Sequence, residues 1–295
     1  MIPIYLASDC TPVLPGLLAQ EFEVVREPGP WIRGMVTSGS LGASAQVMEQ
    51  LPDLEIIANF GVGVDRVDLE AARARGLVVA NTPDVLTESV AELALGLLLS
   101  AARRLPAAER TLRSGGWSVP SLGTQIYGKS CGLVGMGRIG SAIARRAEAF
   151  GMEIAYFARH PREVGYRYIP DLLELARQSD FLVLIVPGGP ETDGLVTAEV
   201  LEALGPTGIL INVARGSVVD EAALVSALVE GRLGGAGLDV FAREPEVPRE
   251  LLALDQVVLT PHIGSATQEA RRAMAELCVA NLRSFFTTGK ARTPF

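Results

Sequence analysis

Short apolar runs alternate with amphipathic, helix-like segments along most of the chain. Short apolar runs of this kind are typical of strands. The predicted strands are Ile2–Ala7, Gly34–Ser38, Leu54–Phe60, Leu77–Thr82, Cys131–Val134, Glu153–Phe157, Phe181–Val186, Ile209–Val213, Gly235–Leu238 and Val257–Leu259. The predicted helices are Ser44–Gln50, Asp68–Gly76, Thr87–Arg104, Ile139–Ala149, Asp171–Gln178, Thr197–Leu204, Glu221–Glu230 and Gln268–Phe286. This alternation predicts an α/β protein with parallel sheets.

The alternation falls into two blocks. Residues from 1 to about 93 predict one small α/β domain, and the pattern restarts at Cys131 as a doubly wound sheet. Between the blocks lies Thr87–Arg104, which is apolar nearly all round and therefore predicts a helix that is buried or shared between two bodies. Pro106 interrupts it, and Ser114–Ser130 is rich in Gly, Pro and Ser, which indicates an extended loop.

Composition narrows the classes of function. The chain has 295 residues, a formal net charge of -8 and a pI of about 5.0, which argues against broad attraction to nucleic acid. Its three cysteines are too scattered for a disulfide framework or a metal site and suit a reducing cytoplasm. The first residues lack the pattern of a signal peptide, and the longest apolar run, Leu93–Leu99, is shorter than the roughly 18 residues of a membrane span. We expect a cytoplasmic protein with no membrane or nucleic-acid partner.

The segment "GLVGMGRIG" carries the strongest chemical signal. It matches G-x-G-x-x-G at Gly135, Gly137 and Gly140, between a predicted strand and a predicted helix. In this setting the glycines allow a tight turn, close approach of a diphosphate and close helix packing, while the helix N-terminus offers N–H donors. A methyltransferase can share this turn, so the motif alone does not define the chemistry. The expected dinucleotide contacts are Gly135, Gly137, Arg138, Ile139 and Gly140.

The neighbourhood of the next strand end indicates which dinucleotide binds. An acidic residue about 20 residues after the glycines normally binds the ribose hydroxyls. Here the strand is followed by Ala158, Arg159, His160 and Arg162. Ala158 removes a carboxylate that would repel a 2′-phosphate, and the basic residues can donate charge-assisted hydrogen bonds to one. A solvated basic turn is the simpler alternative, but beside the glycine motif we favour NADP(H) over NAD(H).

His262, one of two histidines, is a candidate acid/base. It lies in "LTPHIGS", just after a predicted strand, at the edge where ligands bind in such sheets. Reduction of a keto group requires a proton, and histidine is the usual source near neutral pH. A lone histidine is more often structural, but the strand-to-loop position between Pro261 and Gly264 favours proton donation.

Three charged residues also follow predicted strands: Arg215 in "INVARGSVVD", and Asp239 and Glu244 in "GLDVFAREP". An arginine can bind a substrate carboxylate and polarise the adjacent carbonyl. A carboxylate beside an imidazole orients it and favours its protonated form. Taken singly, Arg215 and Glu244 are better explained as surface charges.

Several segments together resemble the D-isomer-specific 2-hydroxyacid dehydrogenase family. They are "GVGVD", "NTPDVLTESVAELALGLLL", "GLVGMGRIG", "INVARGSVVDE", "GGAGLDVFAREP" and "LTPHIGSAT", and the resemblance extends from about Ile56 to Phe286. "RRLPAAERTLRSGGW" and "FAR" resemble the NADPH-dependent glyoxylate/hydroxypyruvate reductase branch. The resemblance implies a Rossmann cofactor domain, 94–265, inserted in a smaller flavodoxin-like substrate domain, 1–93 and 266–295. It also implies reduction of a small 2-keto acid to the D-2-hydroxy acid.

The resemblance implies a role for each matching residue. Arg215 would bind the substrate carboxylate and keto oxygen, His262 would be the acid/base, and Glu244 its partner. The backbone of Val62 and Gly63 would hold the substrate carboxylate. The further implied cofactor contacts, in which Asp239 faces the nicotinamide amide, are Val186, Pro187, Thr192, Val213, Ala214, Arg215, Asp239, His262 and Gly264. No metal is expected.

The family likeness also suggests a homodimer with Leu105–Lys129 as an arm, in which Trp117 either reaches the neighbouring subunit or packs locally. Two rival functions remain open. One is a dehydrogenase of the same fold that uses NAD and acts on phosphoglycerate or an aryl pyruvate. The other is a dinucleotide-sensing protein without catalysis. Glu244 argues against formate dehydrogenases, which carry Gln at this position, and the poor match of the first 50 or so residues leaves the substrate undefined.

Overall fold

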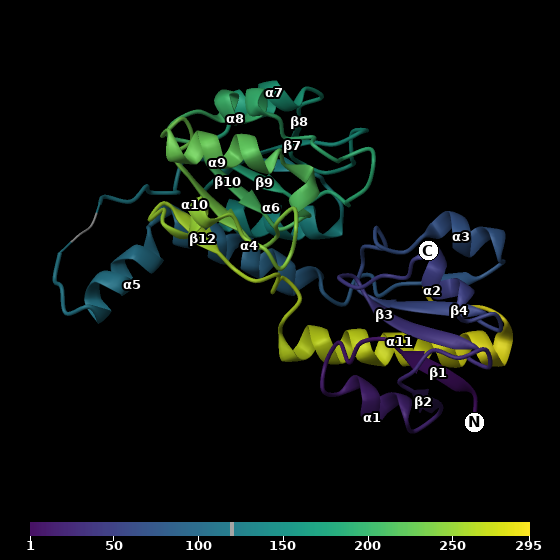
Figure 1. The fold of residues 1–295 in the computed structure, drawn as a ribbon. Helices are drawn as coiled ribbons and strands as arrows, with labels where there is room; N and C mark the ends of the chain where they lie inside the picture. The colour runs from purple at the N-terminus through teal and green to yellow at the C-terminus, as the bar shows by residue number, and fades with distance from the viewer. Residues whose placement is uncertain (119–120) are drawn as a thin grey trace. The chain divides into compact units, whose positions relative to one another are not determined.

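The computed structural model describes residues 1–118 and 121–295, and the chain forms two compact units. The first unit consists of Met1–Leu86 and Ser265–Phe295, and the second of Thr87–Gly264 (Figure 1). The first junction lies ahead of the boundary expected at 93, because helix α4 (Thr87–Ala102) packs along its length in the second unit, against α6 (Arg138–Ala149). The roles of the two units in substrate and cofactor binding stay predictions.

The first unit is a parallel sheet covered by helices. Its strand order is β2-β1-β3-β4-β5. The strands are β1 (Pro3–Leu6), β2 (Glu23–Val25), β3 (Gly34–Ser38), β4 (Ile56–Phe60) and β5 (Val78–Ala80). The helices are α1 (Leu14–Leu18), α2 (Ala45–Glu49), α3 (Leu69–Ala74) and α11 (Gln268–Thr288). All of β4 is buried, since α11 packs on it and its other face joins an apolar core that includes Met35, Met48 and Ile57.

The second unit holds a larger parallel sheet, ordered β12-β11-β10-β9-β6-β7-β8 among the described residues. The strands are β6 (Ser130–Val134), β7 (Glu153–Phe157), β8 (Arg167–Tyr168), β9 (Phe181–Leu184), β10 (Ile209–Asn212), β11 (Gly235–Leu238) and β12 (Val257–Leu259). Besides α4 and α6, the helices are α5 (Leu105–Arg113), α7 (Leu172–Arg177), α8 (Ala198–Leu204), α9 (Glu221–Val229), α10 (Arg249–Leu252) and the short η1 (Gly216–Val218). The strand order runs in opposite directions from β6, so the carboxyl ends of β6 and β9 mark a switch point where such sheets bind ligands.

The predicted α/β class with two doubly wound parallel sheets is confirmed. Every predicted strand and helix has a counterpart, whereas β2, β8, α1, α5, α10 and η1 were not predicted. Val119 and Pro120, part of the predicted loop Ser114–Ser130, lie outside the described residues. No helix in the described part of the chain combines the length and apolarity that a bilayer crossing requires.

Candidate active site

The glycine turn joins β6 to α6 and is shaped by close contacts. A Cβ at Gly135 would lie 2.5 Å from the Ile185 carbonyl oxygen, and one at Gly140 would lie 2.4 Å from the Gly135 oxygen. Gly137, the N-cap of α6, faces open space instead. Two of the glycines therefore serve packing, and the third keeps the helix N-terminus accessible. An accessible helix N-terminus fits the diphosphate of a dinucleotide.

The basic residues lie beside this turn, at the end of β7. Arg159 forms an ion pair with Glu191, from the loop after β9, and the two side chains are 73% and 74% exposed. Because β7 and β9 flank β6, this pair connects two loops on either side of the glycine turn. His160 and Arg162 are exposed, and the Arg162 N–H donates to the Tyr156 hydroxyl at 2.7 Å. The Ala158 carbonyl accepts a bond from Tyr168 at 3.1 Å.

The loop after β9 is folded on itself. The Thr192 hydroxyl donates to the Pro187 carbonyl at 2.6 Å and is also 3.1 Å from the Gly189 oxygen. Val186 and Thr192 are half-buried and Pro187 is exposed. The hydroxyl of Thr192 therefore shapes the loop, and its predicted contact with a cofactor stays a prediction.

Arg215 is presented by a rigid turn after β10. The fully buried Asn212 side chain accepts from the Ala214 N–H at 3.0 Å and donates to the Arg215 carbonyl at 2.9 Å. Val213 and Ala214 are buried beneath the turn. A Cβ at Gly216 would lie 2.1 Å from the Phe241 carbonyl oxygen, so only glycine lets this turn pack on the segment that follows β11.

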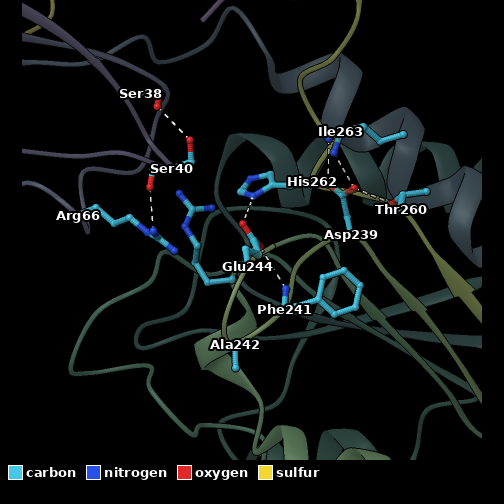
Figure 2. A network of polar contacts seen from close by, with 12 residues as sticks. Ser38, Ser40, Arg66, Asp239, Phe241, Ala242, Glu244, Thr260, His262 and Ile263 are labelled. Atoms are coloured by element: carbon cyan, nitrogen blue, oxygen red, sulfur yellow. Dashed lines mark hydrogen bonds and ion pairs between the residues drawn. The ribbon is translucent and has the colours of Figure 1, made fainter. Parts of the chain in front are cut away.

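His262 and Glu244 are in direct contact. The Nδ1 atom of His262 lies 2.8 Å from Oε2 of Glu244, and Oε1 of Glu244 accepts from the Phe241 N–H at 3.1 Å (Figure 2). The His262 side chain is 40% exposed while Glu244 is only 19% exposed. The carboxylate thus holds one ring nitrogen, and the accessible ring retains Nε2 for proton exchange. This is the arrangement that an oriented general acid requires.

Asp239 builds the loop that carries His262. Its buried carboxylate accepts from the Thr260 hydroxyl at 2.6 Å and from the N–H groups of Ile263 and Gly264 at 2.7 and 2.8 Å. Burial raises the pKa of the Asp239 carboxyl, although these bonds and the nearby His262 act in the opposite direction. His262 has a φ of 53°, a left-handed conformation that the surrounding bonds maintain. The expected contact between Asp239 and a nicotinamide amide stays a prediction, whereas its structural role is visible.

Val62 and Gly63 follow β4 in the first unit. Val62 is exposed and Gly63 is half-buried. In the neighbouring loops Arg66 donates to the Ser40 carbonyl at 2.8 Å, and the hydroxyls of Ser38 and Ser40 lie 3.0 Å apart. Among the described residues, no cluster of three or more His, Cys, Asp or Glu side chains could hold a metal ion.

Comparison with known proteins identifies the family. Residues 95–264 match the family model described as D-isomer specific 2-hydroxyacid dehydrogenase, NAD binding domain. The chain is 50% identical over 266 residues to hydroxyphenylpyruvate reductase of Plectranthus scutellarioides, which covers 89% of this chain and 85% of the relative. The chain belongs to the D-isomer specific 2-hydroxyacid dehydrogenase family. The resemblance read from the sequence motifs is thereby confirmed.

Within this family two further likenesses concern one activity. A glyoxylate/hydroxypyruvate reductase A of Arabidopsis thaliana is also 50% identical over 266 residues, 89% of this chain and 85% of that protein. The crystal structure of an NADPH-dependent glyoxylate/hydroxypyruvate reductase from Sinorhizobium meliloti, in complex with NADP and malonate, superposes with a TM-score of 0.94. It is 47% identical, and the match covers 100% of this chain and 96% of that one.

The sequence indicated most of the candidate residues in the second unit by their strand-end positions. It did not indicate Glu191, Asn212 or Thr260, whose partners were then unknown. Asn212 ends an apolar strand three residues before Arg215, and this position is a signal that could have identified it. The catalytic roles of Arg215, Glu244 and His262 stay predictions.

Proposed function

We propose that this protein is an NADPH-dependent reductase of small 2-keto acids, of the glyoxylate and hydroxypyruvate type, that forms the D-2-hydroxy acid. The observation that carries the proposal is the contact between His262 and Glu244 at the carboxyl edge of the sheet. It provides an oriented proton donor after β12, and its partner Glu244 follows β11, the strand next to the one that presents Arg215. The named activities of the Arabidopsis and Sinorhizobium relatives support the choice of substrate.

The cofactor would be held by the glycine turn and by the end of β7. The N–H groups at the start of α6 would bind the diphosphate above Gly137, where the backbone is open. Arg159, with His160 and Arg162, would bind the 2′-phosphate, and Ala158 leaves room for it. When bound, NADPH supplies the hydride that reduces the keto carbon.

The side chains of the chain supply the remaining chemistry. Glu244 accepts the hydrogen bond from Nδ1–H of His262, so Nε2 donates its proton to the keto oxygen. Arg215 binds the substrate carboxylate and polarises the keto group. Val62 and Gly63 hold the same carboxylate through their backbone N–H groups. Asp239 maintains the loop that positions the imidazole.

We further propose a cytoplasmic homodimer that uses the Leu105–Lys129 arm. Trp117 and Leu122 are 93% and 88% exposed, and Leu112 on α5 is exposed as well. Helix α5, at the start of the arm, extends outward from the sheet of its unit (Figure 1). Exposed apolar side chains of this kind mark interaction sites. Three free cysteines suit a reducing compartment, and the net charge of -8 opposes a nucleic-acid partner.

A second candidate is the reduction of aryl pyruvates. It is favoured by the 50% identity to the Plectranthus hydroxyphenylpyruvate reductase, which equals the identity to the Arabidopsis relative. The two candidates share the cofactor site and the proton donor and differ only in the substrate side chain. Relative kcat/KM values therefore distinguish them.

The test is a panel of keto acids with NADPH or NADH, followed by nicotinamide absorbance. Glyoxylate and hydroxypyruvate should give the highest kcat/KM, with NADPH preferred about tenfold or more, as expected for a phosphate bound by charged donors. His262→Ala should lower turnover roughly 10²–10⁴-fold and leave NADPH binding nearly intact. Highest activity on hydroxyphenylpyruvate would favour the second candidate. NADPH binding without turnover of any keto acid would leave a dinucleotide-sensing protein.

A further inference from the structure

Two buried asparagine side chains hold the loop that follows β4. Nδ2 of Asn59 donates to the carbonyls of Gly61 and Gly63 at 3.2 and 2.9 Å. Nδ2 of Asn81 donates to the carbonyl of Val62, between them, at 2.8 Å. Asn59 is fully buried and Asn81 is 7% exposed. Three successive carbonyls are therefore turned toward the interior of the first unit.

The direction of the carbonyls dictates the direction of the N–H groups. In a planar trans peptide the C=O of one residue and the N–H of the next point in opposite directions. The N–H groups of Val62, Gly63 and Val64 thus face away from the two asparagines. Among the described residues none of these three N–H groups donates a hydrogen bond. Successive outward N–H groups form a concavity that binds anions.

The Asn81 backbone is itself fixed by α11 and by the segment that follows it. Its carbonyl accepts from the Thr293 hydroxyl at 2.7 Å and from the buried Asn281 amide at 3.2 Å. Its N–H donates to the Thr293 carbonyl at 3.2 Å. Because its backbone N–H and carbonyl are both hydrogen-bonded, the Asn81 backbone is fixed, and its side chain is positioned to donate to the Val62 carbonyl.

Burial of the Asn59 side chain is partly unfavourable. Its Oδ1 atom is buried and has no hydrogen-bond partner among the described residues. An unsatisfied buried acceptor is unfavourable, and an apolar side chain of similar shape would avoid that penalty. An apolar side chain could not donate the two hydrogen bonds that Nδ2 makes to the loop carbonyls.

We propose that Asn59 and Asn81 are positioning residues of the substrate-carboxylate site. By binding the carbonyls of Gly61, Val62 and Gly63, they present the N–H groups of the loop to a carboxylate. This inference rests on the proposed function, in which Val62 and Gly63 hold the carboxylate of the keto acid. Neither asparagine contacts the substrate; both act through the loop backbone.

The role predicts a particular kinetic signature. The carboxylate is the same group in the ground state and in the transition state, so the loop binds both equally. Loss of its orientation weakens both complexes together, which raises KM and leaves kcat unchanged. A general loss of structure would instead lower kcat and NADPH binding as well.

The test is Asn81→Ala, because this variant removes the donor to Val62 and spares the fully buried Asn59. The measurements are KM and kcat for glyoxylate at saturating NADPH, and the Kd of oxamate, an unreactive keto-acid analogue, in calorimetry with NADPH present. KM and the oxamate Kd should rise about tenfold or more. This factor corresponds to the free-energy cost of leaving one buried acceptor, the Val62 carbonyl, without its hydrogen bond. The kcat and the Kd of NADPH should stay within about twofold, as uniform binding requires. Asn59→Ala should act in the same direction.

The matched control is Arg75→Met, at the opposite end of β4. Arg75 donates to the carbonyls of Leu51 and Pro52 at 2.7 and 3.2 Å, so its loss destabilises the same unit without touching the loop. It should lower the thermal midpoint and leave KM and the oxamate Kd unchanged. Unchanged oxamate binding in Asn81→Ala, or an equal rise in Arg75→Met, would overturn the inference. Wild-type protein that turns over no keto acid would refute the proposed function, while the oxamate comparison still decides the inference.

Discussion

Glu191 forms an ion pair with Arg159, the residue that we propose binds the 2′-phosphate of the cofactor. Their ion pair is exposed on both sides, and exposed pairs stabilise proteins by only about 0–1 kcal/mol. The pair therefore contributes little to folding. A 2′-phosphate carries more negative charge than one carboxylate and accepts more hydrogen bonds, so it should displace Glu191 from Arg159. Glu191 then acts as an internal competitor for the cofactor.

Substitution of Glu191 should therefore strengthen cofactor binding. Glu191→Gln should lower the Kd of NADPH about two- to fivefold, because the arginine no longer has to leave a partner. Arg159→Ala should raise it about tenfold or more. Fluorescence titration with NADPH and NADH measures both, and the NADH values should change little. Arg177→Ala, which removes an exposed arginine paired with Glu174 on α7, is the control. Equal effects on the two dinucleotides would contradict a 2′-phosphate site.

Sequence reasoning identified residues by position but not by partner. The sequence indicates His262 and Glu244 because both follow predicted strands, and in the structure their side chains lie 2.8 Å apart. Glu191 was not selected, because it reaches Arg159 from the loop of a different strand. Asn59 and Asn81 lie within predicted apolar strands, and the carbonyls that their side chains bind belong to a loop whose path the spacing of residues does not reveal.

At the scale of elements, the unit β6–turn–α6 separates the two uses of glycine. At Gly140 an added Cβ would meet the Gly135 oxygen, so Gly140→Ala should lower the thermal midpoint by roughly 3–10 °C. At Gly137 the Cβ would enter open space with a φ of -85°, which alanine adopts readily. Gly137→Ala should therefore shift the midpoint by less than about 3 °C.

The same pair of variants tests where the diphosphate binds. Gly137→Ala should weaken NADPH binding about tenfold or more, because its methyl group occupies the approach to the helix N-terminus. Differential scanning fluorimetry with and without NADPH gives stability and binding in one experiment. If NADPH raised the thermal midpoint of Gly137→Ala as much as that of the wild-type protein, the diphosphate would have to bind elsewhere.

Elements were predicted where the apolar pattern was long, and missed where it was short or interrupted. β2 and β8 have only three and two residues and are partly exposed, so neither shows a buried run. α1 contains Pro15 and Gly16, which normally break a helix. Pro106 marks the interruption after α4 as predicted, but it also lies in the first turn of α5, where proline is favoured.

At the scale of the molecule, the exposed arm leads to a prediction about assembly. Leu112→Glu combined with Leu122→Glu should convert the proposed dimer to a monomer, because charged side chains are costly in an apolar interface. Sedimentation velocity measures the change, and the circular dichroism spectrum should be unaltered. Wild-type protein that sediments as a monomer, or a dimer that survives both substitutions, would rule out this arm as the interface.

The two-unit architecture could be predicted because strand–helix alternation stops and restarts around Thr87–Arg104. The position of the junction could not be predicted, because a helix that is apolar on all sides has no single face that indicates which unit it packs in. The contacts of α4 with α6, β10 and β11 assign it to the second unit. The unit to which a helix belongs depends on its packing contacts, and the pattern of apolar residues along that helix does not specify them.

The return of Ser265–Phe295 to the first unit has a consequence for biosynthesis. The ribosome releases Met1–Leu86 first, but α11, which covers β4, is translated after the whole of the second unit. The early strands therefore leave the exit tunnel without their covering helix, and Asn81 lacks Thr293 until the residues after α11 have been translated. The continuous second unit can complete its fold on the nascent chain, whereas the first cannot do so until α11 has emerged. During that interval the uncovered sheet is the part of the chain most in need of a chaperone.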